Sequence, residues 1–235
     1  MILEELNRDY AINYFKSLLV IGMIIGHCVQ LLTDYRPQFI EYFSDYINLI
    51  TFSGFTFSFG YVYYKAYIKK NILNKKRFLI PSYKTLFAFY ISGFFFRLLV
   101  IPGRWLTFKE YVKILLLWDI PGYSEFLLSF FIISLLFCIL FKCIKKYFEN
   151  DNLIFIAIIL SLAMTFFPYK YILINEFGLI IGSNKFPCFP IIQYSCLFFI
   201  GFYFAKNNIK YNKIIFVISC ITLIIFLLIG SATIN

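Results

Sequence analysis

Long apolar runs separated by short polar segments dominate the chain. A helix needs about 20 apolar residues to cross the core of a bilayer, where the backbone has to satisfy its own hydrogen bonds. On this rule the pattern predicts seven membrane-spanning helices, at residues 14–32, 46–64, 79–101, 126–141, 153–167, 189–205 and 214–229. The apolar piece 114–118 is too short to cross alone and is interpreted as interfacial or re-entrant. The predicted fold class is all-α: one polytopic transmembrane helical bundle over residues 1–235.

The composition supports a membrane protein over a soluble one. Of the residues, 61% are hydrophobic and 14% are charged, and the mean hydropathy is +0.80. A soluble domain carries roughly 25% charged residues. The polar residues are too few to cover the surface of a soluble fold. The excess apolar surface is therefore expected to face lipid.

The positive charges lie in short loops, where they indicate topology. The formal net charge is +10, and no basic patch forms outside the loops that flank predicted spans, so nucleic acid is not expected as a partner. Lys and Arg are retained on the cytoplasmic side of a membrane. The loop after the second predicted span is therefore cytoplasmic, with Lys65, Lys69, Lys70, Lys75, Lys76 and Arg77. Alternation then puts the N-terminus inside and the C-terminus outside. Arg104, Lys109 and Lys113 fit less well, because they fall on the predicted outer side.

Cysteine spacing offers no metal site. Six cysteines are scattered, mostly inside apolar runs, without a CxxC or paired spacing that would build a metal site. They are interpreted as small core residues. No metal is expected.

Ionisable side chains within predicted spans are costly, which makes each of them a candidate for function. Five lie within spans or at their ends: Lys16, His27, Lys84, Arg97 and Glu125. For four of them, taken singly, the simpler interpretation is a long side chain that reaches the membrane interface. His27 differs because it is the one histidine of the chain. A neutral imidazole accepts a proton near physiological pH and can serve as a general base; the alternative is a hydrogen bond between helices.

Lys16 and His27 share one face of the first predicted helix. They are eleven residues apart, close to three turns, which separates them by about 16 Å along the axis. A cation near the inner surface and a base toward the outer one suit a substrate with a polyanionic head and a distant reactive group. Gly22 and Gly26 form a GxxxG pattern in the same helix, which predicts close helix packing.

Three segments in order resemble the acyltransferase-3 family. The segment 16–27, from Lys16 to His27, matches the basic-x10-His signature of that family's first helix. Phe52-Ser53-Gly54-Phe55 is similar to its F-x-SGF element. Lys75-Lys76-Arg77-Phe78-Leu79-Ile80-Pro81-Ser82-Tyr83 is similar to the basic cluster that runs into the Pro-aromatic start of its third helix. The resemblance covers roughly residues 9–90. Beyond it, Ser124-Glu125-Phe126-Leu127 stands where the family often has Trp-Phe-Leu, and Phe199-Ile200-Gly201-Phe202 resembles a helix end of the family.

The resemblance implies an enzyme of the bacterial inner membrane. It would move an acetyl or other acyl group from acyl-CoA, as donor substrate and not as a permanent cofactor, to a hydroxyl of a cell-surface or lipid-linked carbohydrate. His27 would be the general base or handle the acyl group. Lys16, with the cluster of Lys75, Lys76 and Arg77, would bind the phosphates of CoA, although the cluster is explained equally well as a topology signal. Ser53 and Gly54 would let two helices approach, or Ser53 would orient His27.

Two departures from the family remain. Lys16 stands where the family usually has Arg, and Lys lacks the planar fork that holds a phosphate with two hydrogen bonds. The family usually has about ten spans, so seven would fit a member without its last three helices, either a shortened form or a truncated product. Two other classes stay open: a transporter or flippase for a polysaccharide or lipid-linked intermediate, and a scaffold in which Lys16 and His27 only pack.

Overall fold

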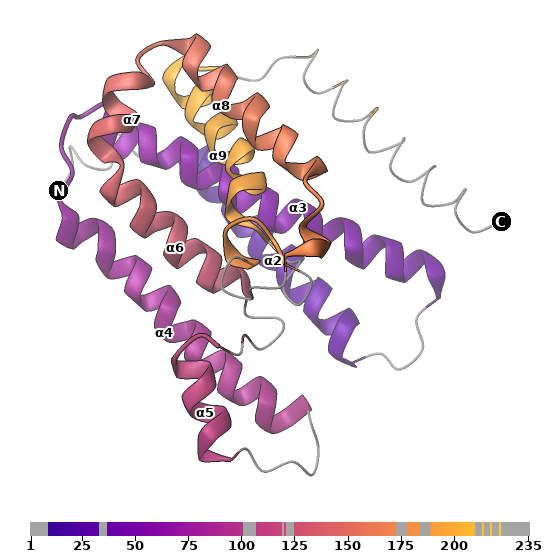
Figure 1. Ribbon diagram of the computed structural model, residues 1–235. Helices are drawn as coiled ribbons and strands as arrows, with labels where there is room; N and C mark the ends of the chain where they lie inside the picture. The colour runs from indigo at the N-terminus through magenta and orange to yellow at the C-terminus, as the bar shows by residue number, and fades with distance from the viewer. Residues whose placement is uncertain are drawn as a thin grey trace.

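The computed structural model describes residues 9–32, 37–100, 107–118, 120, 125–172, 178–183, 189–209, 213, 217 and 221. Within these ranges the chain is helical and contains no strand. The helices are α2 Tyr10–Leu32, α3 Gln38–Tyr63, α4 Lys75–Val100, α5 Phe108–Leu115, α6 Glu125–Ile139, α7 Phe141–Tyr147, α8 Asp151–Ala163 and α9 Ile191–Lys206, with single π or 3₁₀ turns at η1 Tyr64–Ile68, η2 Met164–Phe166 and η3 Tyr169–Tyr171. Figure 1 shows their arrangement. The predicted all-α class is confirmed for this part of the chain.

Helix α3 packs against α2 on one side and α9 on the other. Its contact with α9 is a crossing of two backbones. Gly60 of α3 lies against the carbonyl of Phe198, and Gly201 of α9 lies against the carbonyl of Phe57. Any side chain at either glycine would overlap the facing backbone, so the crossing depends on residues without a Cβ.

Small residues also set the contact between α2 and α3. Gly22 faces Ile47 and Thr51 of α3, and Gly26 faces Asn48. Three residues before Gly22, the side chain of Leu19 fills the space that Gly54 leaves. The two helices are therefore antiparallel, with residues 26, 22 and 19 meeting residues near 48, 51 and 54 in turn. Gly22 and Gly26 thus lie in a helix contact, as the GxxxG pattern predicts, and Gly54 makes a close approach to Leu19.

Aromatic rings fill the core where α3, α6 and α9 meet. Phe137 of α6 stacks on Phe198 of α9 with ring centroids 3.7 Å apart. Tyr63, which is fully buried, donates a hydrogen bond to the carbonyl of Phe137 over 2.8 Å. Phe78 at the start of α4 closes the cluster. Each buried ring contributes a large apolar contact area to the core, and aromatic pairs are further stabilised by their edge-to-face geometry.

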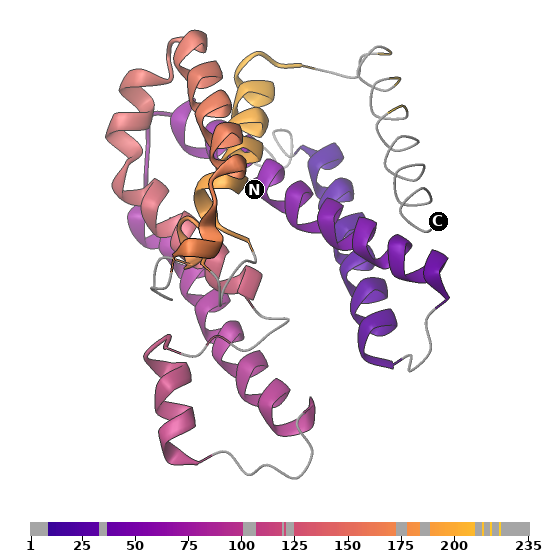
Figure 2. The ribbon, with the colours of Figure 1, turned by 45° about the vertical axis from the view of Figure 1, so that its right-hand side comes forward.

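Helices α4 and α6 pack together beside this core, and α5 folds back on the second half of α4. Figure 2 shows this α4–α5 pair at the opposite end of the molecule from α7. Thr107 and Glu110 form a capping box that begins α5, and Tyr90 of α4 donates a hydrogen bond to the carbonyl of Leu115. The predicted apolar piece 114–118 is thus the end of α5 and the turn that follows it.

The number of membrane crossings is only partly supported. Among the described residues, two helices, Tyr10–Leu32 and Lys75–Leu98, are long and apolar enough to cross a bilayer, and the bent pair α6 and α7 would make a third. Helix α8, with its η2 extension, and α9 are apolar but shorter. Six of the seven predicted spans coincide with a described helix, whereas 214–229 falls almost entirely outside the described residues. A bundle of seven spans stays a prediction.

Helix α3 has 26 residues and is long enough to cross a bilayer, but its most apolar stretch is less apolar than those of α2 and α4. Ser, Thr, Tyr and Gly lower its hydropathy, and many of them are buried against neighbouring helices: Ser44, Thr51, Gly54, Thr56, Ser58, Gly60 and Tyr63. By contrast, apolar side chains of α2 such as Leu18, Ile21 and Ile24 point outward. An inner helix of a membrane bundle is commonly rich in small and polar residues, while the outer ones present apolar faces.

Candidate functional site

Lys16 of α2 lies where two cavities meet. Its side chain is half-buried and lines both of them. One cavity, called the basic cavity below, opens at the end of the bundle where α2 begins and α3 ends. The other, called the apolar cavity, runs between α2, α3, α4 and α6. The Lys16 ammonium group therefore lies between the basic cavity and the apolar cavity.

The basic cavity has a volume of about 710 Å³. Its charged lining consists of one carboxylate and four ammonium groups, from Asp9, Lys16, Lys65, Lys69 and Lys70. Asn13, Tyr61 and Asn208 add polar groups. The cations outnumber the single carboxylate, so the chamber attracts an anionic ligand.

Asp9, Tyr61 and Lys65 form a hydrogen-bonded triad in the wall of the basic cavity. Lys65 Nζ lies 2.8 Å from Asp9 Oδ2 and 2.6 Å from the hydroxyl of Tyr61, which donates to Asp9 over 2.7 Å. Hydrogen bonds from Lys65 and Tyr61 lower the pKa of the Asp9 carboxyl. Partial burial alone would lower the pKa of Lys65, but its hydrogen bonds to Asp9 and Tyr61 outweigh this and raise it. The triad ties the segment before α2 to the end of α3.

The apolar cavity has a volume of about 370 Å³. Besides Lys16, its lining comprises Met23, Phe55, Ser58, Phe59, Val62, Thr85, Phe126, Leu127 and Phe130. The hydroxyl of Ser58 is buried and has no hydrogen-bond partner among the described residues. A buried hydroxyl without a partner costs free energy, so a bound molecule with a polar group in its middle would relieve this cost.

His27 lies on the same face of α2 as Lys16 and Met23. It is half-buried and sits one turn beyond Met23, past the end of the apolar cavity. The helix is continuous from Tyr10 to Leu32, so the predicted stripe from Lys16 to His27 is confirmed as geometry. The order along this face is basic cavity, Lys16, apolar cavity and His27.

The three predicted supporting residues, Ser53, Gly54 and Glu125, lie in different surroundings. Gly54 is buried under Leu19. Ser53 lies beside Gly54, and the antiparallel register puts it about two turns from His27 along the pair, which favours its packing role over the orientation of His27. Glu125 is the first residue of α6, directly before Phe126 and Leu127 of the apolar cavity.

The predicted phosphate-binding cluster lies apart from Lys16. Lys75, Lys76 and Arg77 are exposed in the first turn of α4. None of them lines the basic cavity, and Lys75 instead lines a third cavity beside α7. The lysines that line the basic cavity with Lys16 come from the segment directly after α3: Lys65, Lys69 and Lys70.

Sequence reasoning assigned these three lysines only to topology and missed Asp9 and Tyr61. A signal was present, since Tyr61, Lys65 and Lys69 follow each other at intervals of four. If α3 continues as a helix, such residues share the face that meets the start of α2. Among the described residues, no group of three or more His, Cys, Asp or Glu side chains could hold a metal ion.

Comparison of the chain with protein families, curated protein sequences and solved structures finds no significant match.

Proposed function

We propose that the chain is an integral membrane O-acyltransferase that moves an acetyl or other acyl group from acyl-CoA to a hydroxyl of a cell-surface or lipid-linked carbohydrate. The observation that carries the proposal is the order of features along one face of α2: a basic cavity, Lys16, an apolar cavity and His27. The resemblance of residues 9–90 to acyltransferase-3 proteins points to the same reaction.

The two cavities suit the two ends of an acyl-CoA. Its nucleotide end carries several phosphate charges, which the lysines of the basic cavity would bind by charge-assisted hydrogen bonds. Its flexible arm carries amide groups and ends in the thioester. An arm that passes Lys16 into the apolar cavity would bring an amide within reach of the buried Ser58 hydroxyl. The exposed cluster of Lys75, Lys76 and Arg77 would then contribute to the charge of the entrance from outside the cavity.

His27 is proposed as the general base. Its imidazole would take the proton of the acceptor hydroxyl while the oxygen attacks the carbonyl carbon of the thioester. The carbon–sulfur bond then breaks, the new ester bond remains on the carbohydrate, and the departing thiolate takes the proton back from the imidazolium. The separation of Lys16 and His27, about 16 Å along the helix, leaves room for the arm between the bound phosphates and the reacting carbonyl.

The proposed location follows from the same argument. The basic segment that follows α3 and the basic helix α7 would face the bacterial cytoplasm, where acyl-CoA is present, with the N-terminus on the same side. The carbohydrate acceptor would approach His27 from the other half of the membrane. Membrane lipid, acyl-CoA and the carbohydrate are the proposed partners.

Transfer of labelled acetyl from acetyl-CoA into membrane glycan tests the proposal. Membranes with the natural chain are compared with His27→Ala, expressed to the same level, and with Cys28→Ala as the matched control at the adjacent, exposed position. Loss of label in His27→Ala alone is the expected result. Equal labelling by all three proteins would exclude His27 as the base. If none of the three transfers label while an unrelated acetyltransferase works in the same membranes, the chain is not an acetyltransferase for these glycans.

A further inference from the structure

The α6 and α7 helices form a sharp bend at the end of the molecule. Their axes differ by 67° across the single residue Leu140. Helix α7, Phe141–Tyr147, is short and carries Lys142, Lys145 and Lys146 between its two aromatic ends. A cationic helix that turns away from an apolar one, with aromatic residues beside its charges, is typical of the surface of a membrane.

A cavity of about 860 Å³, the bend cavity, lies between this bend and the loop that precedes α4. Its walls comprise Asn71, Leu73, Lys75, Cys138, Ile139, Phe141, Lys142, Lys145, Lys146 and Glu149. Lys145 Nζ donates a hydrogen bond to Asn71 Oδ1 and holds the two walls together. Asn71 has a left-handed backbone with φ of 55°, a conformation that Asn tolerates better than most residues. The bend cavity shares no lining residue with the basic or the apolar cavity.

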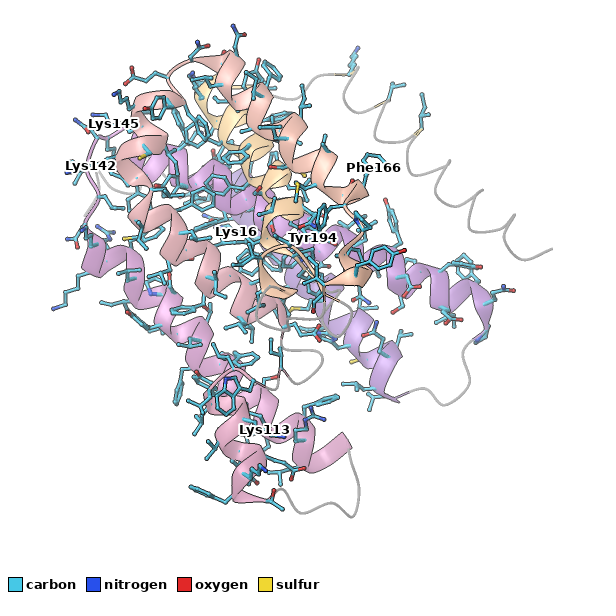
Figure 3. All side chains as sticks on the ribbon, viewed as in Figure 1. Lys16, Lys113, Lys142, Lys145, Phe166 and Tyr194 are labelled. Atoms are coloured by element: carbon cyan, nitrogen blue, oxygen red, sulfur yellow. The ribbon has the colours of Figure 1, made fainter. Side chains whose placement is uncertain are left out.

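The bend cavity carries a net positive charge. Four lysines, Lys75, Lys142, Lys145 and Lys146, line it together with one carboxylate, Glu149. Lys142 and Lys146 are exposed, four residues apart on α7, so both ammonium groups can reach one ligand. Figure 3 shows Lys142 and Lys145 together at this end of the bundle and Lys113 at the opposite end.

Directly beside these charges the surface is apolar. Ile139 is 70% exposed and Leu140 is 42% exposed at the bend, while Leu73 and Phe141 line the bend cavity itself. A soluble anion would gain nothing from this apolar side. An amphiphile with a phosphate head and hydrocarbon chains would contact both the lysines and the apolar surface beside them.

We propose that the bend cavity binds the phosphate headgroup of an anionic phospholipid. Lys142 and Lys146 contact the phosphate, Lys75 adds charge from the facing wall, and the acyl chains descend along Ile139 and Leu140. The site holds the bend of α6 and α7 at the membrane surface. It depends on the location of the chain in a membrane, and its two phosphate-binding residues, Lys142 and Lys146, take no part in the proposed acyl transfer.

Binding of phosphatidylglycerol to the detergent-solubilised full chain tests this assignment. The lipid that stays bound after removal of micelles is counted by native mass spectrometry, with phosphatidylcholine as the neutral reference. Replacing Lys142 and Lys146 together by Gln weakens binding of phosphatidylglycerol by roughly ten- to thirtyfold, since each cation contributes separately near a charged headgroup. The matched control replaces Lys109 and Lys113, also exposed and four residues apart, on α5. This control leaves binding unchanged.

Any of three results would overturn the assignment. One is equal retention of phosphatidylcholine and phosphatidylglycerol by the natural chain. Another is displacement of phosphatidylglycerol by glycerol 1-phosphate at equal concentration, which would show a site for a soluble phosphate. If the Lys142 and Lys146 variant does not fold, salt provides the second measurement. Raising the salt from about 50 to 500 mM lowers retention of phosphatidylglycerol by the natural chain and leaves that of phosphatidylcholine unchanged; insensitivity of both to salt would equally refute the site.

Discussion

Gly60 of α3 and Gly201 of α9 lie side by side at the crossing of their helices, each against a backbone carbonyl of the other helix. The carbonyls belong to Phe198 and Phe57, so the contact is reciprocal. Because the two backbones touch, α9 lies close enough to α3 for Phe198 to stack on Phe137 and pack against Tyr63. The aromatic core therefore depends on glycine at both positions, because any larger side chain would separate the two helices.

Gly201→Ala is expected to destabilise the protein by about 2 kcal/mol or more, because the methyl group would force the α3 and α9 backbones apart. Gly22→Ala is the matched control, since a Cβ there would meet its nearest neighbours at 3.4 Å, a tolerable contact, and alanine favours helix. Denaturant unfolding in detergent measures both variants. A Gly201→Ala protein as stable as the natural chain would show that the crossing relaxes freely.

The triad of Asp9, Tyr61 and Lys65 predicts a stability plateau at neutral pH. The lowered pKa of Asp9 contributes stability that is complete above the ordinary carboxyl range and is lost as the pH falls through the lowered value. The raised pKa of Lys65 contributes stability that is complete below the ordinary lysine range and is lost as the pH rises through the raised value. The plateau thus extends from about pH 5 to pH 9.

Asp9→Asn tests this plateau. Both side chains of the ion pair are partly exposed, so the expected loss at pH 7 is only about 0.2 to 1 kcal/mol. The loss is expected to shrink toward pH 2, where the natural carboxyl is protonated as well. Unfolding of both proteins at the two pH values gives the difference, and a loss that is the same at pH 7 and pH 2 would argue against an electrostatic contribution.

If acyl-CoA is the donor as proposed, Lys16→Met is expected to raise the KM for acyl-CoA by roughly tenfold or more with a smaller change in kcat, because it would remove one charge-assisted hydrogen bond to a phosphate. Lys84→Gln is the control, since Lys84 is exposed on α4 and lines neither the basic nor the apolar cavity. Initial rates at several donor concentrations separate the two constants. A lower kcat at unchanged KM would place Lys16 in the chemical step instead.

Ser58→Ala is expected to weaken binding of the proposed donor without lowering the stability of the protein. Removing a buried hydroxyl without a partner among the described residues leaves stability unchanged or raises it by about 1 kcal/mol. If the hydroxyl contacts the bound donor, the KM for acyl-CoA rises at the same time.

Ser44→Ala provides the comparison for this prediction. Ser44 is another buried serine of α3 whose hydroxyl has no partner in the described part of the chain, and it lies outside the apolar cavity. Thermal unfolding and initial rates of the two variants separate the roles. If Ser58→Ala and Ser44→Ala give the same KM, Ser58 serves only packing.

The helices themselves were predictable, since residues 14–32 and 79–101 are apolar enough for lipid and both became long helices, α2 and α4. The face shared by Lys16 and His27 followed from helix geometry alone, as did the packing of Gly22 and Gly26. Neighbours along one helix are fixed by its period, so such predictions need no tertiary information.

Sequence alone determined that the chain is helical and apolar, and which residues share a face of α2. Only the tertiary structure decided which lysines join Lys16, that α3 lies between α2 and α9, and that α6 bends into α7. The reason is physical: in lipid the outer surface of a helix is as apolar as its packed surface, so apolar periodicity does not reveal which face meets a neighbour. Lys65, Lys69 and Lys70, and not Lys75, Lys76 and Arg77, line the basic cavity together with Lys16, because the chain runs on from α3 through its π turn toward the start of α2, where Asp9 binds Lys65.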